Sequence, residues 1–372
     1  MANFTMFRSA LNVVVRSWIV FSGLGIVAAG CGSTPSTVEV VASGAVALAS
    51  GQQLPVTIAV DKTNVYWMNL GTNDTTDAKS PAPWTGGQVM RCPIAGCNET
   101  PISLASGRVQ GPAVREPAAF ATDGTSVYWS DGVTAPAILK CTVGGCDNAP
   151  EVISDQGAES LAIFQGNIYW TQFAAEVFAC PISGCSSGQT MPWSAGNSPC
   201  DVGIAVDGSG IYWATMAPDA VLTCALGGCG GAPTALMSSS ASVAAVSQVA
   251  LDANNVYFTD ANAEVGMILA CRKSGCGSSP NVLASGLNSP MGIATDGLNV
   301  YWTETGNYFV NGEAVDGTGL VRKCSVTGCD NTPYNIASGL NGPVGIAVDD
   351  TYVYWTESGA SVADGKVWMA PK

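Results

Sequence analysis

The sequence predicts an all-β fold made of seven repeated units, and three observations predict it. An aromatic dipeptide recurs at spacings of 41 to 62 residues, four short strand-like segments recur with it, and the first and last units are incomplete in complementary ways. Self-similarity at a period of roughly 20 to 50 residues is typical of arrays in which each repeat is one supersecondary unit. We therefore expect one repeat array rather than two unrelated domains.

The dipeptide Tyr-Trp, or Tyr-Phe in one copy, follows a β-branched residue in every unit. Branched and aromatic side chains favour β-strands because they fit a pleated, half-buried surface. In each unit a segment ending in Asp (A) precedes the dipeptide (B), and segments of the type Val-Met-Arg-Cys (C) and Leu-Ala-Ser-Gly (D) follow it. The third unit departs in segment A, where it reads Leu-Ala-Ile-Phe-Gln-Gly-Asn and has no Asp. The seven copies of segment B begin at Val65, Val127, Ile168, Ile211, Val256, Val300 and Val353.

The two ends of the array indicate how it closes. The array opens with a lone D segment, Val46 to Gly51, and ends with a C segment, Val367 to Ala370, that has no D segment after it. Seven complete units exist only if the first segment becomes the outer strand of the last unit. Such pairing also removes the exposed edges of an open array. We therefore predict a seven-bladed β-propeller of four-stranded antiparallel blades over residues 46–372, closed by its N-terminal strand.

Twelve of the fourteen cysteines form six pairs with four residues between the partners, each between segments C and D. Cysteines opposite each other across a short hairpin come within disulfide range. A four-cysteine zinc site would need two pairs to converge, whereas these hairpins point apart around a ring. Ala370 replaces the first cysteine in the seventh unit, and Cys200 has no assigned role. The predicted disulfides are Cys92–Cys97, Cys141–Cys146, Cys180–Cys185, Cys224–Cys229, Cys271–Cys276 and Cys324–Cys329.

The first thirty residues have the features of an export signal. Arg8 and Arg16 precede an uncharged stretch, Ser17 to Gly30, that is too short for a normal membrane span. This stretch runs into Cys31 in a manner that resembles a bacterial lipoprotein signal, whose cysteine is acylated after cleavage; ordinary cleavage that leaves Cys31 unmodified is the alternative. We predict a signal peptide over residues 1–30, a tether over 31–45, and a protein that is lipid-anchored in the bacterial cell envelope or otherwise secreted.

The composition excludes several classes of function. The chain has no His, which rules out Ser-His-Asp and Cys-His catalysis and His-ligated metals. It has 14 Lys and Arg against 28 Asp and Glu, a net charge of −14. Because nucleic-acid phosphates require cationic side chains, such a chain is a poor nucleic-acid binder. The sequence contains no recognisable catalytic motif, and we assign no catalytic or metal-binding residue.

Two segments carry a family resemblance. Val300 to Glu304 and Val353 to Glu357, each preceded by Pro-x-Gly-Ile-Ala and Asp, resemble the YWTD class of β-propeller repeats, and residues 46–372 are similar to secreted bacterial NHL-like and YWTD-like propellers. The chain departs from the YWTD class in its cysteine pairs and in its blade number, which is usually six in that class. The resemblance implies protein or ligand binding for most members and calcium-dependent hydrolase or lyase activity for some.

Binding is expected on the side of the ring that carries the B–C and D–A connections. The A–B turns are uniform and begin with a capping Asp, and the C–D turns are stapled. The B–C connections differ in length, and variable loops on a rigid scaffold are where binding usually resides. Acidic residues at the start of these connections are expected to surround the channel mouth, either as a solvated rim or as a site for a cation or a basic partner. These residues are Asp131, Asp260, Glu304 and Glu357, with Asn69 and Gln172 in equivalent positions.

The function expected is that of an envelope-tethered, non-catalytic binding or scaffold propeller. Its partner is a protein or a small ligand, with Trp84, Tyr308 and Phe309 as candidate anchors, and the chain is expected to be a monomer that contacts the membrane only through a lipid. The alternative is a calcium-dependent hydrolase or lyase, which needs carboxylates that converge in the channel. No cofactor is expected outside that alternative, where it is Ca²⁺. The A segments carry mostly Gly, Ile, Ala and Val, which favours binding.

Overall fold

The computed structural model describes the propeller region with gaps. The described residues are 44–72, 86–107, 119–131, 136–172, 176–185, 201–216, 219–238, 243, 245–262, 265–306, 309–310, 313–314, 317–359, 361 and 363–372. The predicted signal peptide, Cys31, Trp84, Cys200 and Tyr308 lie outside these residues. Within them, we find no helix long and apolar enough to cross a membrane.

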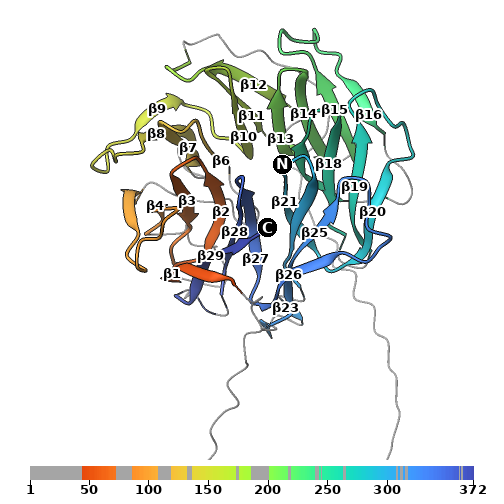
Figure 1. Ribbon diagram of the computed structural model, residues 1–372. Coiled ribbons are helices and arrows are strands. Elements are labelled where there is room, and N and C mark those ends of the chain that lie inside the picture. The colour runs from red at the N-terminus through yellow and green to blue at the C-terminus, as the bar shows by residue number, and fades with distance from the viewer. Residues whose placement is uncertain are drawn as a thin grey trace, which may run out of the picture. The chain divides into compact units, whose positions relative to one another are not determined.

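Seven antiparallel sheets stand around a central axis (Figure 1). The strands of a blade follow the order A to D from the axis outward. Six blades have four strands; for blade 3 three strands are described, and residues 186–200 after them lie outside the description. The all-β, seven-bladed prediction is therefore confirmed. The strands of blades 1 to 3 are β2 (Pro55–Val60), β3 (Asn64–Asn69), β4 (Gln88–Pro93), β5 (Ile102–Ser106); β6 (Phe120–Thr122), β7 (Ser126–Asp131), β8 (Ala137–Thr142), β9 (Glu151–Ser154); β10 (Ser160–Phe164), β11 (Asn167–Gln172) and β12 (Glu176–Pro181).

Blades 4 to 6 continue the series in chain order. A short hairpin of β23 (Phe309–Val310) and β24 (Glu313–Ala314) lies in the B–C connection of blade 6, so the candidate anchor Phe309 is part of that hairpin. The blade strands are β13 (Asp201–Asp207), β14 (Gly210–Met216), β15 (Asp219–Cys224), β16 (Thr234–Met237); β17 (Val246–Leu251), β18 (Asn255–Asp260), β19 (Gly266–Arg272), β20 (Asn281–Leu287); β21 (Pro290–Thr295), β22 (Asn299–Glu304), β25 (Gly319–Ser325) and β26 (Tyr334–Leu340).

Blade 7 contains both ends of the propeller. It consists of β27 (Pro343–Val348), β28 (Tyr352–Glu357), β29 (Gly365–Pro371) and, as its outer strand, β1 (Val46–Gln52). β1 runs antiparallel to β29, with Val46 opposite Met369 and Ala47 opposite Trp368. The predicted closure by the N-terminal strand is confirmed.

The Tyr of the repeated dipeptide fastens the A–B turn. In blade 1, one oxygen of Asp61 accepts the N–H groups of Thr63 and Asn64 (2.7 and 2.8 Å), and the other accepts the hydroxyl of Tyr66 (2.7 Å). This Asx turn satisfies backbone donors that the hairpin leaves free. The same Tyr-to-Asp bond recurs in four other blades, between Tyr128 and Asp123, Tyr257 and Asp252, Tyr301 and Asp296, and Tyr354 and Asp349.

Blades 3 and 4 depart from this turn in different ways. In blade 3, Gln165 and Gly166 both have positive φ (48° and 75°) and form a two-residue hairpin turn without Asp. In blade 4, the Tyr212 hydroxyl lies 2.8 Å from the Ser209 hydroxyl, and the carboxylate of Asp207 pairs with Lys273 of blade 5. The departure that the sequence shows in segment A of the third unit thus corresponds to a different turn type.

The aromatic residue after each Tyr lies between neighbouring blades. The six Trp and the one Phe at this position are fully buried. Among the described residues, seven clusters of buried side chains form, and each joins two adjacent blades; Trp129 of blade 2, for example, packs with Tyr66 and Leu104 of blade 1. The cluster around Trp67 joins blade 1 to Leu48 and Val367 of blade 7. The hydrophobic core of the protein is therefore the set of spaces between blades.

The Thr that follows Trp in blades 6 and 7 links the innermost strands. Thr303 accepts the N–H of Gly292 (3.0 Å) and donates its hydroxyl to the carbonyl oxygen of Val344 in blade 7 (2.7 Å). Thr356 donates in the same way to Val56 of blade 1 (3.3 Å), across the closure of the ring. A Cβ on Gly292 would lie 2.5 Å from the Val344 oxygen, so glycine is required for this close approach.

The six predicted disulfides are present, with Cα–Cα distances of 5.4 or 5.5 Å. Their loops have a second role that the sequence did not indicate, because those of blades 1, 2, 3, 5 and 6 contact the outer strand of the preceding blade. The Sγ atoms of Cys141 and Cys146 lie 3.6 and 3.5 Å from the Leu104 carbonyl oxygen, and Asn148 accepts the N–H of Ser106 (2.9 Å). The stapled loops thereby cover strand edges that would otherwise stay open to pairing with another chain.

We expect the Asp turns to make stability depend on pH. Burial alone would raise the pKa of the Asp349 carboxyl, but the hydrogen bonds from Tyr354 and from the Thr351 and Tyr352 amides outweigh burial and lower it. A carboxyl whose pKa is lower in the folded state stabilises the fold above the unfolded pKa of about 3.9, and this contribution is lost as pH falls through the folded pKa. Asp349→Asn should cost about 1 kcal/mol at pH 7, a low value because the carboxylate is partly solvated.

Thermal unfolding between pH 7 and pH 2 measures this effect. The stability difference between wild type and Asp349→Asn should begin to shrink below pH 4, where the unfolded wild-type chain takes up a proton, and should disappear once the folded carboxyl is protonated as well. The exposed neighbour Asp350 is the matched control, and Asp350→Asn should follow the wild type throughout. A difference for Asp349→Asn that is the same at pH 7 and pH 2 would contradict the assignment.

Candidate functional site

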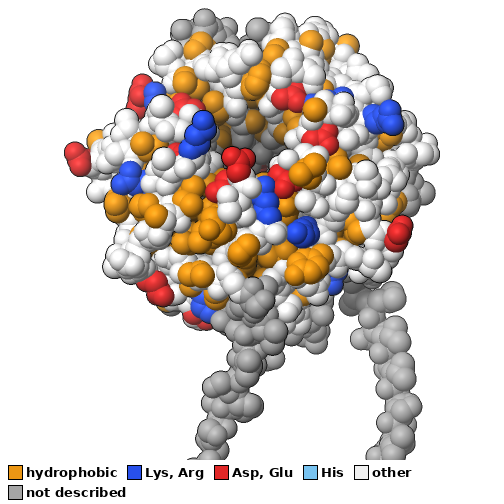
Figure 2. Space-filling view, viewed as in Figure 1, with side chains coloured by type: hydrophobic (Ala, Val, Ile, Leu, Met, Phe, Trp, Pro, Cys, Tyr) orange, Lys and Arg blue, Asp and Glu red, His pale blue; other side chains and the backbone are white. Residues whose placement is uncertain are grey.

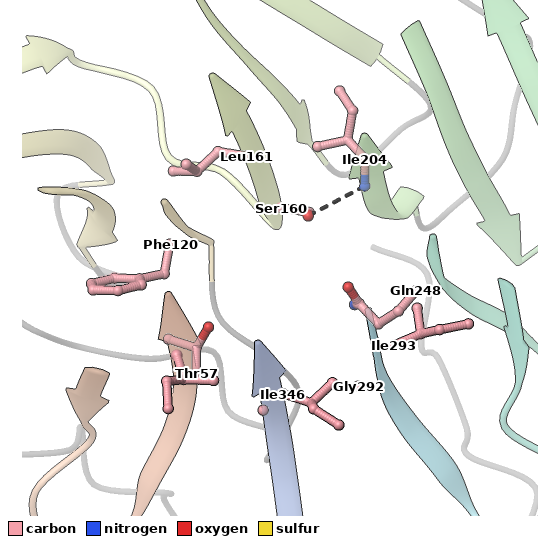
Figure 3. Close-up of a pocket in the computed structure, with 11 residues that line it drawn as sticks. Thr57, Phe120, Ser160, Leu161, Ile204, Gln248, Gly292, Ile293 and Ile346 are labelled. Carbon is pink, nitrogen blue, oxygen red and sulfur yellow. Dashed lines mark hydrogen bonds between the residues drawn. The ribbon is translucent and has the colours of Figure 1, made fainter. Parts of the chain in front are cut away.

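A cavity of about 150 Å³ lies on the axis of the ring (Figure 3). Its lining comes from the innermost strands of all seven blades, and none of the lining side chains is ionisable. Figure 3 shows the Gln248 amide directed into this space, and the Ser160 hydroxyl accepts the N–H of Ile204 (3.3 Å). The volume corresponds to about five water molecules. One lining residue from each blade in turn is Thr57, Phe120, Ser160, Ile204, Gln248, Gly292 and Ile346.

The polar lining residues were not singled out from the sequence. Thr57, Ser160 and Gln248 stand where three other blades have Gly203, Gly292 and Gly345. An alignment of the seven A segments contains this signal, since a larger polar side chain replaces a glycine that packs tightly elsewhere. These residues can offer hydrogen bonds to water or to a small polar molecule, but they form no acid–base pair.

The two sides of the ring differ in their connections, as the sequence indicates. Every A–B turn has two or three residues between its strands. The B–C connections range from two residues (217–218) to 18 (70–87), and the D–A connections whose two strands are both described range from two (288–289) to 13 (107–119). The A–B side of the propeller is therefore uniform to within one residue, and the other side carries most of the variation in loop length.

Two ion pairs on the uniform side join neighbouring blades. Lys273 of blade 5 pairs with Asp207 of blade 4, and Lys372 of blade 7 with Asp296 of blade 6 (2.9 Å). In Figure 2 basic and acidic side chains lie together around the central hollow of the face in view. Within the described part of the chain, no group of three or more His, Cys, Asp or Glu residues is arranged to hold a metal ion.

The four carboxylates expected to form a solvated rim are buried, so that expectation is wrong. Their exposed fractions are 8% for Asp131, 1% for Asp260, 2% for Glu304 and 1% for Glu357. Because a buried carboxylate costs free energy unless it is paired or hydrogen-bonded, each needs partners inside the protein. The separate expectation that these residues bind a cation or a basic partner stays a prediction.

The partners of Glu304 and Glu357 explain their burial. Glu304 accepts the N–H of Asn288 (3.1 Å) and the indole N–H of Trp302 (3.0 Å), and Arg322 lies 3.1 Å from the same carboxylate. Glu357 accepts the N–H of Asn341 and the indole N–H of Trp368, both at 2.6 Å. Asn288 and Asn341 begin two-residue D–A turns, so the carboxylates fasten these turns.

Amide side chains take this role in two other blades. In blade 1, Asn69 and the indole N–H of Trp67 both donate to the Gln52 side-chain oxygen (3.0 and 3.1 Å). In blade 3, Gln172 donates to the Gly157 carbonyl oxygen (2.7 Å). The side chain at the end of strand B therefore stabilises the D–A connection, whether it is a carboxylate or an amide.

We expect Glu357→Ala to lower the free energy of unfolding by about 2 to 4 kcal/mol, because two buried donors lose their acceptor. Glu357→Gln keeps one acceptor oxygen and should lower the free energy of unfolding by about half as much. Urea unfolding monitored by tryptophan fluorescence measures both. An alanine variant within 0.5 kcal/mol of wild type, about the error of such a measurement, would instead favour the solvated rim.

Comparisons with known proteins are informative about the fold. No protein-family model matches the chain, and no curated protein matches it in sequence. The WD40 β-propeller domain of Doa1 has a TM-score of 0.58 at 9% identity, covering 88% of this chain and 97% of that one. A nidogen/laminin complex (TM-score 0.47, 18% identity, 65% of this chain and 88% of that one) and BamB from Moraxella catarrhalis (0.47, 11%, 84% and 83%) also match. At these identities the similarity to Doa1 shows a shared β-propeller fold and nothing about function.

Proposed function

We propose that the protein is an exported, envelope-tethered binding propeller without catalytic activity, which recognises a protein or a small ligand with the B–C and D–A side of the ring. The contrast between the two sides carries this proposal: A–B turns of two or three residues oppose B–C connections of two to 18. Binding residues are found disproportionately on variable loops that a rigid scaffold positions.

The scaffold has the rigidity that this role needs. Five A–B turns are fastened by a Tyr-to-Asp bond, and six C–D turns by a disulfide. The axial cavity offers hydroxyl and amide groups but no ionisable side chain, which supports binding over acid–base catalysis. The proposal requires neither a cofactor nor a second copy of the chain.

Six disulfides indicate an oxidising, extracytoplasmic environment. The lipid anchor at Cys31 is a finer proposal, supported by the small residues and apolar stretch before it. Cys31→Ser should move the protein from the membrane fraction to the soluble fraction and remove the acyl mass from the intact mature chain. Identical fractionation and mass for variant and wild type would contradict the anchor.

Site-specific photo-crosslinking tests which side of the ring binds. A photoreactive amino acid in place of Trp84, in the long B–C connection of blade 1, should capture a partner in intact cells. The control replaces Leu298, which is 73% exposed in an A–B turn, and should capture none. Capture from position 298 alone, or equally from both positions, would contradict the proposed binding side.

A further inference from the structure

The outer strand of blade 7 is attached differently from the outer strands of blades 1, 2, 4, 5 and 6. Those strands are continuous with the chain at both ends, through a stapled C–D turn and a D–A connection. β1 continues through residues 53–54 into β2, but its other end is not joined to its partner β29. β1 can therefore peel away from Val46 onward while the rest of blade 7 stays in place.

Blade 1 contacts β1 near the end that is not joined to β29, through its disulfide loop. The Sγ atom of Cys97 lies 3.4 Å from the carbonyl oxygen of Leu48. Leu48 and Ala49 are buried in one cluster with Cys92, and Cys97 packs against it. At the other end of β1, the Gln52 side chain accepts the two hydrogen bonds from blade 1 described above. Blade 1 thus holds β1 at both ends, and the disulfide loop serves the end that can peel.

We infer that the Cys92–Cys97 disulfide is a lock on the closure of the ring. The disulfide holds the loop in the conformation that covers Leu48. Without the disulfide the loop gains conformational freedom, and its contact with β1 becomes weaker. Opening by reduction is balanced by a dithiol: the dithiol gives two electrons and two protons, Cys92 and Cys97 become thiols, and the dithiol becomes a disulfide. The inference does not depend on the proposed binding function.

The disulfide of blade 5 shows why the lock is specific to blade 1. Its loop makes equivalent contacts, with Cys271 Sγ 3.5 Å from the Leu236 carbonyl oxygen and the Cys276 N–H donating to the same oxygen (2.9 Å). The strand beneath it, β16, is tied to β15 by the Cys224–Cys229 turn. Loss of the blade 5 disulfide therefore frees a loop above a strand that stays connected at both ends.

Hydrogen–deuterium exchange of the full-length protein tests the lock. The double variant Cys92→Ser/Cys97→Ser should exchange the amides of residues 46–52 at least about tenfold faster than wild type. The matched control Cys271→Ser/Cys276→Ser should leave that segment at the wild-type rate. Equal exchange of residues 46–52 in the two variants, whether fast or slow, would overturn the inference.

A covalent replacement of the lock separates this effect from general destabilisation. Val46→Cys/Met369→Cys joins residues that are direct partners in β1 and β29, and intact mass shows whether the bond has formed. In the Cys92→Ser/Cys97→Ser background this bond should restore slow exchange, or folding itself if that background does not fold. Failure of the bond to form, or rapid exchange or misfolding once it has formed, would overturn the inference.

Discussion

Pairing between β1 and β29 is the constraint on which the rest of the molecule depends. It completes the seventh blade and turns a linear array into a ring, so that every blade has a neighbour on both faces. Seven buried clusters follow from this, and the one that joins blades 7 and 1 contains Leu48 of β1 itself. The bond from Thr356 to Val56 also exists only because the ring is closed. Without β1 the edge of β29 would be exposed, and the burial around Trp67 would be incomplete.

The Tyr-Trp-Thr motif of blades 6 and 7 is explained by packing, because each of its side chains has a different structural partner. The Tyr hydroxyl fastens the A–B turn of its own blade, the indole fills the space against the preceding blade, and the Thr hydroxyl reaches the innermost strand of the next one. A motif that recurs because of packing identifies the fold and does not identify the function. Function then has to come from the parts that do not repeat, which are the B–C and D–A connections and the polar side chains of the axial cavity.

The sequence was sufficient to predict the fold because the patterns that indicate it either lie within one hairpin or follow from counting the repeated segments. Cysteine spacing defines each hairpin, and the unmatched D and C segments require closure of the ring. The burial of Glu304 and Glu357 was missed because it depends on a turn that begins 16 residues earlier in the chain. A signal for it exists, since Asn-x-Pro recurs at 288–290 and 341–343 ahead of each Glu. Contacts of the disulfide loops with the preceding blade depend on the angle between blades, which no local pattern encodes.

The contact between β1 and β29 is the central claim, and backbone NMR of the deuterated full-length protein tests it most directly. Opposed residues in an antiparallel pair have Cα atoms about 5 Å apart, close enough for nuclear Overhauser effects between amide protons of facing residues. The structure predicts such effects between the Val46–Ala47 and Trp368–Met369 segments. Amides of residues 46–52 that exchange like a free chain, or that show these effects to a strand other than β29, would contradict a ring closed by its own two ends.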